Sequence, residues 1–345
     1  MNTIFINGKF FSQKITGVQR FGREALREIV ASGISIKVLL PANAEVPNDL
    51  QGDNVEFIYV GKSKGYFWEQ VTLPRFCKKY GYPLLNFANV APILYKNNYV
   101  VIHDVCFKEK LPYIDKKWAF RNRVFVRGYI YKAKKIFTVS EFSGKSIKSF
   151  YPKLKNSPKI VYSGFEHVLR TEEERLEGIN GEFYFSSSSV NPNKNFIYVL
   201  NLAKNNPDKK FVISGSANDD YTEFIIKNSI KNVTFTGYVS DGNLKWLYAH
   251  CTGFILPSFY EGFGLTPLEA IAAGCKKIYL SDIPVFREIY GRIAKFFDPN
   301  DYDNTITLNG EITASESDFT ALTDKCSWKN VAKRIIEELP NENGG

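Results

Sequence analysis

The stretch Leu256-Pro-Ser-Phe-Tyr-Glu-Gly-Phe-Gly-Leu-Thr-Pro-Leu-Glu-Ala-Ile-Ala-Ala-Gly274 decides the fold class, because it joins the end of a strand to the start of a helix. The apolar run that enters it, residues 253–257, predicts a buried strand. Thr266, Pro267 and Glu269 have the residue types of an N-cap and of the first and third helical positions, so we expect a helix that begins with a capping box. A strand that leads directly into a helix indicates a βα unit of a parallel sheet.

The two glycines of this stretch predict an anion site. Gly262 and Gly264 let the backbone approach a ligand closely, and the free N–H groups of the helix start attract a diphosphate. Glu261 and Glu269 flank the expected anion, where carboxylates are tolerated if they accept hydrogen bonds from hydroxyl groups. Taken singly, Glu269 only caps the helix and Glu261 is a surface acid. Together with the glycines, they favour one carboxylate on a sugar and the other on a ribose.

Strand and helix patterns alternate along the rest of the chain. Short β-branched and aromatic runs bounded by turn residues are separated by helical patterns, which is typical of βα units. The clearest helix spans Gly17 to Ala31, with Gly33 as its expected C-terminal cap. The expected strands are residues 3–7, 34–40, 55–60, 83–88, 98–103, 135–139 and 159–162 in the first half, and residues 183–188, 211–214, 233–236, 253–257, 277–280 and 294–297 in the second.

The length of 345 residues suits two domains. A polar stretch from Arg170 to Gly181 lacks apolar periodicity and is expected to be a surface linker. We therefore predict an α/β chain of two Rossmann-like, doubly wound domains whose ligand loops face a central cleft. We expect residues 1–168 to form an N-terminal domain and residues 169–325 a C-terminal domain. Residues 326–345 are expected to be a helix and tail that pack back toward the N-terminal domain.

Residues 256–274 resemble the glutamate-x7-glutamate motif of retaining glycosyltransferases of family 4, which have the GT-B fold. The resemblance implies that Glu261 contacts the transferred sugar and Glu269 the ribose, with the backbone from Gly262 to Thr266 (Gly262, Phe263, Gly264, Leu265 and Thr266) against the sugar and phosphates. It also implies that residues 1–168 form the acceptor-side domain and residues 169–325 the donor domain, and that no metal acts at the reaction centre. Further segments similar to the family are Thr16-Gly-Val-Gln19, Val101-Ile-His-Asp104, Thr138-Val-Ser-Glu-Phe-Ser143, Val190-Asn-Pro-Asn-Lys-Asn195, Val233-Thr-Phe-Thr-Gly-Tyr-Val239 and Cys326-Ser-Trp-Lys329.

Lys194 matches the lysine that pairs with the donor phosphates in this family, and its charge suits that role. The family often has an arginine a few residues upstream, but here the upstream run is Ser186-Ser-Ser-Ser189, and Asn193 occupies a position where close relatives often have arginine. Three alternatives remain open. Hydroxyls and backbone amides replace the charge, another basic residue reaches in, or donor binding is weak. Gly237 and Tyr238, in another segment similar to the family, complete the expected donor site.

His103 is the third expected catalytic residue, beside Glu261 and Lys194. A lone histidine is more often structural, but the resemblance implies that this one lines the cleft next to the transferred sugar. Gly17 opens the first long helix and is expected to offer backbone N–H groups to the diphosphate or the acceptor. The candidates for the acceptor side are Gln19, Arg20, Asn86, Asn89 and Asp104.

The net charge of +9 indicates an anionic partner without choosing one. Between Lys108 and Lys135 there are ten Lys or Arg against Glu109 and Asp115, interleaved with aromatic residues. One interpretation is docking on an anionic membrane surface. The alternative, which we favour slightly from the sequence, is a solvated helix whose apolar side chains, among them Phe120, Val124 and Tyr131, face the core.

Several classes of protein are disfavoured by what the chain lacks. The five cysteines have no paired spacing, which argues against disulfides and a zinc site. Asp219 and Asp220 could be mistaken for a metal-binding pair, but they open a predicted helix, where acids complement the dipole. There is no glycine-rich dinucleotide fingerprint after the first strand and no P-loop. Without an 18-residue apolar run or a secretory pattern, the chain is expected in the cytoplasm, or peripheral to the inner face of the membrane.

The resemblance implies a metal-independent hexosyltransferase without a cofactor, which retains the anomeric configuration. The donor is expected to be a nucleotide diphosphate sugar of mannose type or similar. The resemblance to bacterial enzymes of O-antigen and capsule biosynthesis implies a saccharide or lipid-linked saccharide acceptor. Alternatives are an epimerase or hydrolase of nucleotide sugars on the same fold, and a non-catalytic nucleotide-sugar-binding partner subunit. No nucleic acid is expected, because only the net charge suggests one.

Overall fold

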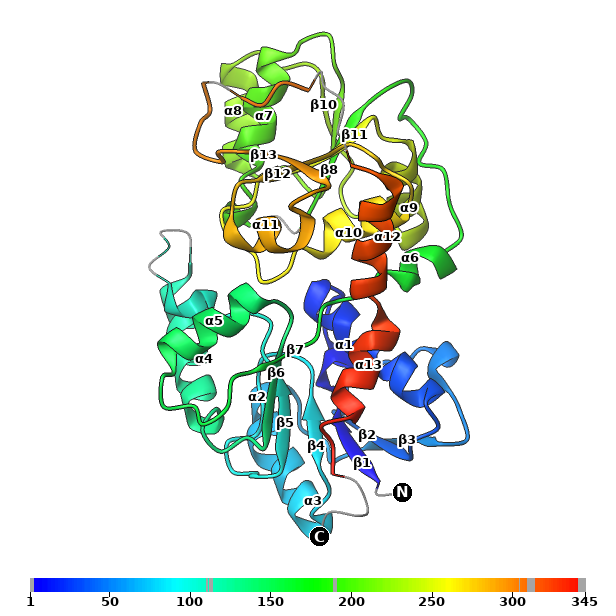
Figure 1. The fold of residues 1–345 in the computed structure, drawn as a ribbon, viewed down its shortest axis with the longest axis vertical. Coiled ribbons are helices and arrows are strands. Elements are labelled where there is room, and N and C mark those ends of the chain that lie inside the picture. Colours follow the sequence, from blue (N-terminus) through cyan, green and yellow to red (C-terminus); the bar gives the residue numbers. More distant parts are fainter. Residues whose placement is uncertain are drawn as a thin grey trace. The chain divides into compact units, whose positions relative to one another are not determined.

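The computed structural model describes residues 3–109, 111, 114–188, 191–303, 305–308 and 314–340. The chain divides into two compact units (Figure 1). Unit 1 extends to Ser163 and includes the C-terminal segment that starts at Trp328, whereas unit 2 spans Gly164–Ser327. The boundaries expected from the sequence, after residues 168 and 325, lie close to these divisions.

Unit 1 is built on a seven-stranded sheet in the order β3-β2-β1-β4-β5-β6-β7, and all its pairings are parallel. The chain first adds strands on one side of β1 and then crosses to β4 on its other side. The crevice between the carboxyl ends of β1 and β4 is therefore the switch point, where open α/β sheets bind ligands. The strands are β1 (Ile4–Asn7), β2 (Ile36–Leu40), β3 (Val55–Tyr59), β4 (Leu84–Asn86), β5 (Asn98–Val101), β6 (Lys135–Thr138) and β7 (Lys159–Ile160).

Helices cover both faces of this sheet. They are α1 (Gly17–Ala31), α2 (Gly65–Phe67), α3 (Leu73–Tyr80), α4 (Lys116–Tyr129), α5 (Glu141–Phe150) and α13 (Trp328–Ile336), with short 3-10 segments η1 (Gly8–Ser12), η2 (Asn48–Leu50) and η4 (Cys106–Lys108), and a π-helical turn η3 (Trp68–Thr72). The last helix, α13, packs on α1, as seen beside each other in Figure 1. Trp328 is fully buried, and its ring meets Phe21 edge-on at 5.5 Å between centroids. The final helix is thus part of the core of unit 1.

Unit 2 repeats the design with a six-stranded parallel sheet in the order β10-β9-β8-β11-β12-β13. Its switch point lies between β8 and β11. The strands are β8 (Tyr184–Ser187), β9 (Phe211–Ser214), β10 (Val233–Phe235), β11 (Gly253–Leu256), β12 (Ile278–Ser281) and β13 (Ala294–Phe297). The helices are α6 (Glu166–Arg170), η5 (Pro192–Lys194), α7 (Phe196–Asn205), α8 (Asp219–Lys227), α9 (Asp241–His250), α10 (Leu265–Ala272), α11 (Pro284–Tyr290) and α12 (Glu316–Lys325).

The observed strands confirm the predicted alternation, since each predicted strand interval overlaps one strand of the two sheets. The helix predicted from Gly17 to Ala31 is α1 with the same bounds, and Gly33 just beyond it has a φ of 79°, as a C-terminal glycine cap requires. Within the described residues, no helix combines the length and apolar character that a bilayer span requires.

A buried polar network lies at the switch point of unit 1. The amide of Asn7, at the end of β1, donates to Glu69 Oε1 at 3.1 Å and to Asn86 Oδ1, at the end of β4, at 3.0 Å. The Lys9 ammonium donates to Glu69 Oε2 at 2.6 Å, and the Glu69 side chain is only 2% exposed. Burial raises the pKa of Glu69, while Lys9 and Asn7 oppose the rise. The sheet edge is therefore held by an ion pair that depends on both partners.

Removal of a buried side chain from α13 should destabilise unit 1. Ile335 is fully buried in α13, so Ile335→Ala should lower the free energy of unfolding by about 3 kcal/mol through lost burial and a residual cavity. Urea unfolding followed by tryptophan fluorescence measures this, because three of the four tryptophans, Trp68, Trp118 and Trp328, belong to unit 1. Glu337→Ala, at an exposed position near the helix end, is the control. A change below about 1 kcal/mol for Ile335→Ala would show that α13 is not part of the folded core.

Removal of Lys9 should produce a destabilisation that depends on pH. Lys9→Met leaves the buried Glu69 carboxylate without its cation, which should cost about 3 kcal/mol at neutral pH. The raised pKa of Glu69 means that the folded state binds the proton more tightly than the unfolded state, so the penalty applies to the ionised form. The loss should therefore shrink as the pH falls from neutral toward 4.5, the usual pKa of a glutamate, in urea titrations at several pH values.

The matched control for this experiment is Lys37→Met, which breaks the exposed Lys37–Glu56 pair on the same sheet. That change should cost less than about 1 kcal/mol, because solvent screens exposed ion pairs. Equal losses for the two variants at all pH values would contradict a structural role of the buried pair.

Candidate functional site

The glycine turn of residues 262–264 takes the conformation that its sequence requires. Gly264 has a φ of 89° and precedes α10 as its N-cap, and an ideal Cβ at this position would lie 2.4 Å from Phe286 Cε1. Only glycine fits both constraints. The predicted capping box is wrong, because α10 begins at Leu265 and Thr266 is its second residue. Gly264, in a left-handed conformation, is the N-cap instead of Thr266, so the helix starts two residues earlier than predicted.

Lys194 and Glu261 come together at the carboxyl edge of the second sheet. Lys194 ends η5, which follows β8, and Glu261 lies in the loop after β11, the neighbouring strand. The Lys194 ammonium donates to Glu261 Oε1 at 2.6 Å, and the Ser258 hydroxyl donates to the same oxygen at 2.8 Å. The two charged side chains are 17% and 13% exposed. A cation and a carboxylate thus meet at the switch point of unit 2 and remain partly accessible.

Asn193 ties the Lys194 turn to the Glu261 loop. Its side-chain amide donates to the Tyr260 carbonyl at 2.8 Å, and its backbone carbonyl accepts from the Phe259 N–H at 3.0 Å. An uncharged side chain therefore serves to join two loops at the position where the family often has an arginine. The hydroxyls of Ser187 and Ser214, at the ends of β8 and β9, bond to each other at 2.7 Å.

Glu269 is held on both of its oxygens. His167 Nε2 lies 3.0 Å from Glu269 Oε1, and the Tyr248 hydroxyl donates to Oε2 at 2.9 Å. Burial, followed by the Glu269 charge, raises the pKa of Tyr248 well above its usual value, so this hydroxyl remains a donor. Sequence reasoning missed both partners, since their elements, α6 and α9, precede Glu269 by long stretches of chain. The scarcity of histidine was the only signal for His167.

The remaining residues predicted for the donor site have different environments. Phe263 is buried. The Tyr290 hydroxyl donates to the Gly264 carbonyl, and this hydrogen bond holds the glycine turn in place. Gly237 has a φ of 69° and exchanges two backbone hydrogen bonds with Gly215. Tyr238, next to it, is 84% exposed. Asp219 and Asp220 lie in the first turn of α8, as expected, and no group of three or more metal-ligating side chains occurs in the described part of the chain.

His103 lies at the carboxyl edge of the first sheet, after β5. Its Nε2 is 2.8 Å from the Phe87 carbonyl, which can only accept, so this nitrogen carries the proton and Nδ1 is the acceptor. Burial lowers the pKa of His103, although the Phe87 carbonyl and Asp104 oppose this shift. The ring is therefore neutral at physiological pH. The Asn89 side-chain carbonyl accepts from the backbone N–H of His103 at 2.7 Å, and Asn89 itself has a left-handed φ of 61°.

The other candidates of unit 1 separate into accessible and buried groups. Gly17 starts α1 at an exposed position, and nothing lies within 4 Å of where its Cβ would be. Arg20 is partly exposed on the same helix. By contrast, Gln19 and Asn86 are buried, and the Asn86 amide is used within the network of the sheet edge. The Asp104 carboxylate accepts from the Cys106 N–H at 2.9 Å, which stabilises η4.

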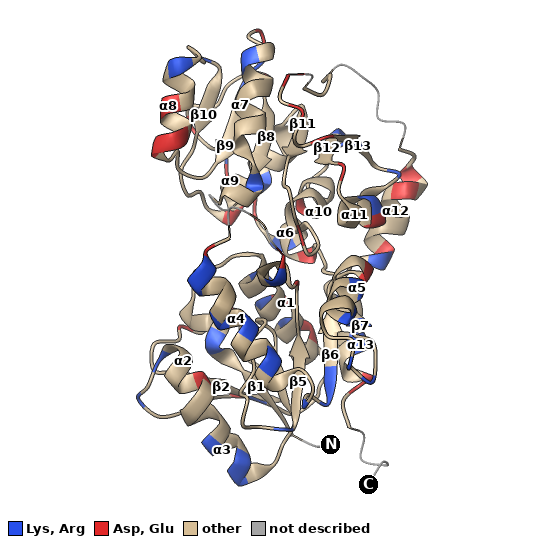
Figure 2. Ribbon diagram, turned by 90° about the vertical axis from the view of Figure 1, so that its left-hand side faces the viewer, with Lys and Arg blue, Asp and Glu red and all other residues tan. Residues whose placement is uncertain are grey.

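The basic aromatic stretch does not face the core as expected. Phe120, Val124 and Tyr131 are 69%, 49% and 47% exposed, so the interpretation favoured from the sequence is wrong for them. The buried face of α4 is formed instead by Ala119, Asn122, Val126 and Tyr129. This register leaves basic and apolar side chains on the surface, and Figure 2 shows the basic positions along α4. Residues 110, 112 and 113 of the stretch lie outside the described residues.

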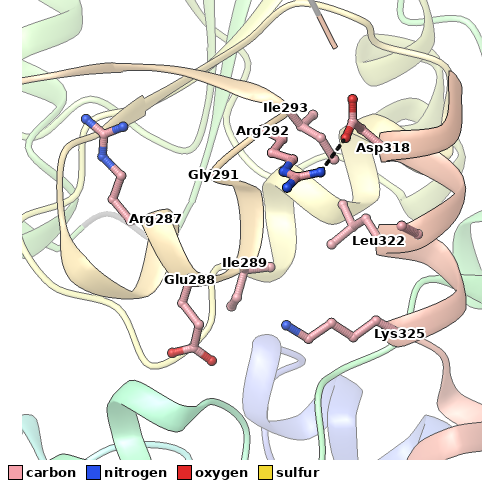
Figure 3. A pocket seen from close by; sticks show the side chains of 10 residues that line it. Arg287, Glu288, Ile289, Gly291, Arg292, Ile293, Asp318, Leu322 and Lys325 are labelled. Carbon is pink, nitrogen blue, oxygen red and sulfur yellow. Dashed lines mark ion pairs between the residues drawn. The ribbon is translucent and has the colours of Figure 1, made fainter. Parts of the chain in front are cut away.

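A pocket of about 380 Å³ in unit 2 lies apart from the predicted site residues (Figure 3). Residues at the end of α11 and on α12 line it, including Ile289, Ile293 and Leu322. Arg292 and Asp318 make a long ion contact of 3.9 Å at its rim. None of the residues assigned to the donor from the sequence lines this pocket.

Comparison with known proteins agrees with the geometry of unit 2. Residues 170–305 match the family model "Glycosyl transferases group 1". The O-antigen chain mannosyltransferase RfbU of Salmonella typhimurium is 27% identical over 214 residues, which cover 60% of this chain and 58% of that protein. The serotype-specific mannosyltransferase WbdA of Escherichia coli is 25% identical over 234 residues, which cover 60% of this chain and 28% of that protein. The chain thus spans about a quarter to three fifths of the length of these relatives.

The fold is also found in solved structures. The Anabaena protein Alr3699/HepE, determined in complex with UDP and glucose, superposes with a TM-score of 0.69 over 98% of both chains at 17% identity. This likeness and the two Rossmann-like parallel sheets of units 1 and 2 identify the fold of this chain as GT-B. Residues 170–305 are thus similar to the glycosyl transferases group 1 family, and the fold of the chain is GT-B.

Proposed function

We propose that this chain is a retaining, metal-independent glycosyltransferase, which transfers a hexose of mannose type from a nucleotide diphosphate sugar to a saccharide or lipid-linked saccharide. The observation that carries the proposal is the cluster of Lys194, Glu261 and Ser258 at the switch point of unit 2, beside the glycine turn. The mannosyltransferases RfbU and WbdA support the sugar and a role in O-antigen or capsule synthesis. The UDP of Alr3699/HepE supports a nucleotide donor.

The donor diphosphate would bind between Lys194 and the N–H groups at the start of α10. An ammonium has three donors, so Lys194 can keep its bond to Glu261 and still donate to phosphate oxygens. The backbone dipoles of α10 add positive potential at the same place. Because negative charge grows on the departing diphosphate, these groups stabilise the transition state more than the ground state.

The two glutamates would orient the sugar and the ribose. Glu261 is held by Lys194 and Ser258 and is partly exposed, so it can accept from a sugar hydroxyl. Glu269 is held by His167 and Tyr248, and each carboxylate oxygen has a second lone pair for a ribose hydroxyl. His103, neutral in unit 1, is proposed to line the sugar and not to transfer a proton through Nε2, which is hydrogen-bonded to the Phe87 carbonyl. Retention would follow if the departing phosphate takes the acceptor proton.

Donor binding should depend on Lys194 and Glu269. Calorimetry with a panel of nucleoside diphosphates and their sugars should find one nucleotide whose Kd rises about 10- to 100-fold in Lys194→Met, since a charge-assisted contact is lost. Glu269→Gln should weaken nucleotides that carry a ribose by about 10-fold. Lys204→Met, on the surface of α7, is the matched control. Wild-type binding that neither variant weakens would refute this donor site.

Turnover separates transfer from the alternative reactions. The preferred donor, incubated with saccharide acceptors and a chelator, should give a product of unchanged anomeric configuration by NMR. Free sugar or an epimerised nucleotide sugar as sole product would overturn the transfer reaction, and loss of turnover with the chelator would overturn metal independence.

We further propose that α4 docks unit 1 on the anionic inner face of the membrane. Phe120 and Val124 lie one turn apart on α4 and are exposed. The same helix carries Arg121, Arg123 and Arg127. An amphipathic helix of this composition binds membranes through apolar insertion and attraction to anionic lipids. This arrangement suits a lipid-linked acceptor, which is itself confined to the membrane.

Loss of the exposed phenylalanine should weaken docking. Phe120→Ser should lower partition of the full chain onto vesicles with anionic lipids by about 10-fold or more, because burial of a phenylalanine contributes about 1.5–3 kcal/mol. Vesicle sedimentation measures this. Ile226→Ser, at a 73% exposed position on α8 of unit 2, should have no effect. An equal loss in both variants, or no binding by the wild type, would contradict the proposed surface.

A further inference from the structure

Three cations gather between η4 and α4 in unit 1. Arg123 and Arg127 are one turn apart on α4 and share a face. Lys108 ends η4, and its ammonium lies 5.0 Å from the centre of the Tyr151 ring. The Arg123 Nε donates to the Phe107 carbonyl at 2.7 Å, which fixes its guanidinium beside Lys108. We call Lys108, Arg123, Arg127 and Tyr151 the cation cluster.

The cation cluster carries uncompensated positive charge. Among the described residues, no carboxylate pairs with Lys108, Arg123 or Arg127. Burial lowers the pKa of Lys108, and the charges of Arg123 and Arg127 lower it further. Like charges held together by a folded backbone cost free energy unless an anion joins them. The buried pair of Lys9 and Glu69 shows the opposite case in the same unit, where each charge has its partner.

The buried hydroxyl of Tyr151 also indicates a ligand at the cation cluster. Its side chain is 2% exposed, and its hydroxyl has no hydrogen-bond partner in the described structure. Burial raises the pKa of Tyr151 to about 12, so the hydroxyl is a donor at physiological pH. A buried polar group without a partner costs free energy, and native proteins rarely retain one without a reason. An anion bound among the three cations would supply an acceptor oxygen beside it.

The chemistry of the cluster selects a phosphate. Ammonium and guanidinium groups are donors only, and guanidinium in particular binds phosphate oxygens through more than one N–H. Exposed apolar side chains adjoin the cluster. Phe120 and Val124 are spaced with Arg127 along one stripe of α4, and Tyr131, just beyond the helix, meets the Tyr151 ring edge-on at 6.1 Å. A ligand that is anionic at one end and apolar at the other matches both parts.

We propose that Lys108, Arg123, Arg127 and Tyr151 form a binding site for the phosphate headgroup of a membrane lipid, next to the apolar stripe of α4. The proposal rests on the docking of α4 proposed above and goes beyond it, because a defined site differs from diffuse attraction to a charged surface. A diffuse surface responds to the number of charges removed, whereas a site responds to which groups are removed.

The test compares variants of the full chain on vesicles that contain phosphatidic acid, whose terminal phosphate is accessible. Arg123→Gln with Arg127→Gln, and Lys116→Gln with Lys117→Gln, each remove two charges from α4. Diffuse attraction predicts equal losses. We expect the arginine pair to weaken vesicle binding at least 10-fold more than the lysine pair. Equal losses would overturn the site while leaving the docking of α4 intact, and absence of wild-type binding would overturn both.

Tyr151→Phe is the sharper variant, since it removes one hydroxyl and changes no charge. We expect vesicle binding to weaken about 10-fold, in line with the loss of a hydrogen bond to a charged group. Thermal unfolding without lipid should show that the variant is at least as stable as the wild type, because the hydroxyl has no partner there. Unchanged vesicle binding would exclude Tyr151 from the site and overturn the proposal as stated.

The source of the phosphate is tested with soluble probes. Inorganic phosphate and a short-chain phosphatidic acid below its micellar concentration are titrated by calorimetry into the wild type and the arginine-pair variant. Tighter binding of the short-chain lipid than of inorganic phosphate, lost in the variant, supports a lipid headgroup. Equal affinity for both would replace the lipid by free phosphate as occupant. Nucleotide binding by the same variant should remain normal, which separates failure here from failure of the donor site.

Discussion

The parallel pairing of β8 with β11 is the constraint on which the donor half of this protein depends. It places the residues that follow each strand at one sheet edge, so Lys194 and Glu261 lie 2.6 Å apart although 67 residues separate them in the chain. The turn at Gly264 then directs α10 from that edge, and Phe286 fills the space that a side chain on Gly264 would occupy. Charge, backbone amides and a helix start converge because the order of strands reverses between β8 and β11.

The polar groups at the two sheet edges differ in burial and in how fully their hydrogen bonds are satisfied. At the edge of the first sheet, Asn7, Glu69 and Lys9 satisfy one another, which stabilises the end of β1 and leaves little for a ligand. At the edge of the second sheet, Lys194 and Glu261 are partly exposed, and each retains hydrogen-bonding capacity. The family match over residues 170–305 covers this second edge. Buried and satisfied groups support the scaffold, whereas paired but accessible groups are available for chemistry.

Local sequence predicted the elements well and their side-chain environments less well. All the expected strands exist, because alternating apolar runs between turn residues reflect burial in a sheet. The capping box failed at Thr266, since a left-handed glycine two residues earlier started the helix. The orientation of α4 also failed: both of its faces carry aromatic residues, so periodicity alone did not identify the buried one. Packing of Ala119, Val126 and Tyr129 against the core decided it.

The sequence by itself determined the two-unit α/β architecture, the strand-to-helix segment of residues 256–274, and the pair Glu261 and Glu269 with Lys194 as donor-site candidates. These depend on local patterns: alternation, glycine spacing and charge. Only the tertiary structure decided that Lys194 bonds to Glu261, that His167 and Tyr248 hold Glu269, and that three cations converge beside Tyr151. Such contacts join residues distant in the chain, and strand order and helix rotation set them. Both follow from burial of the whole core, which no single segment encodes.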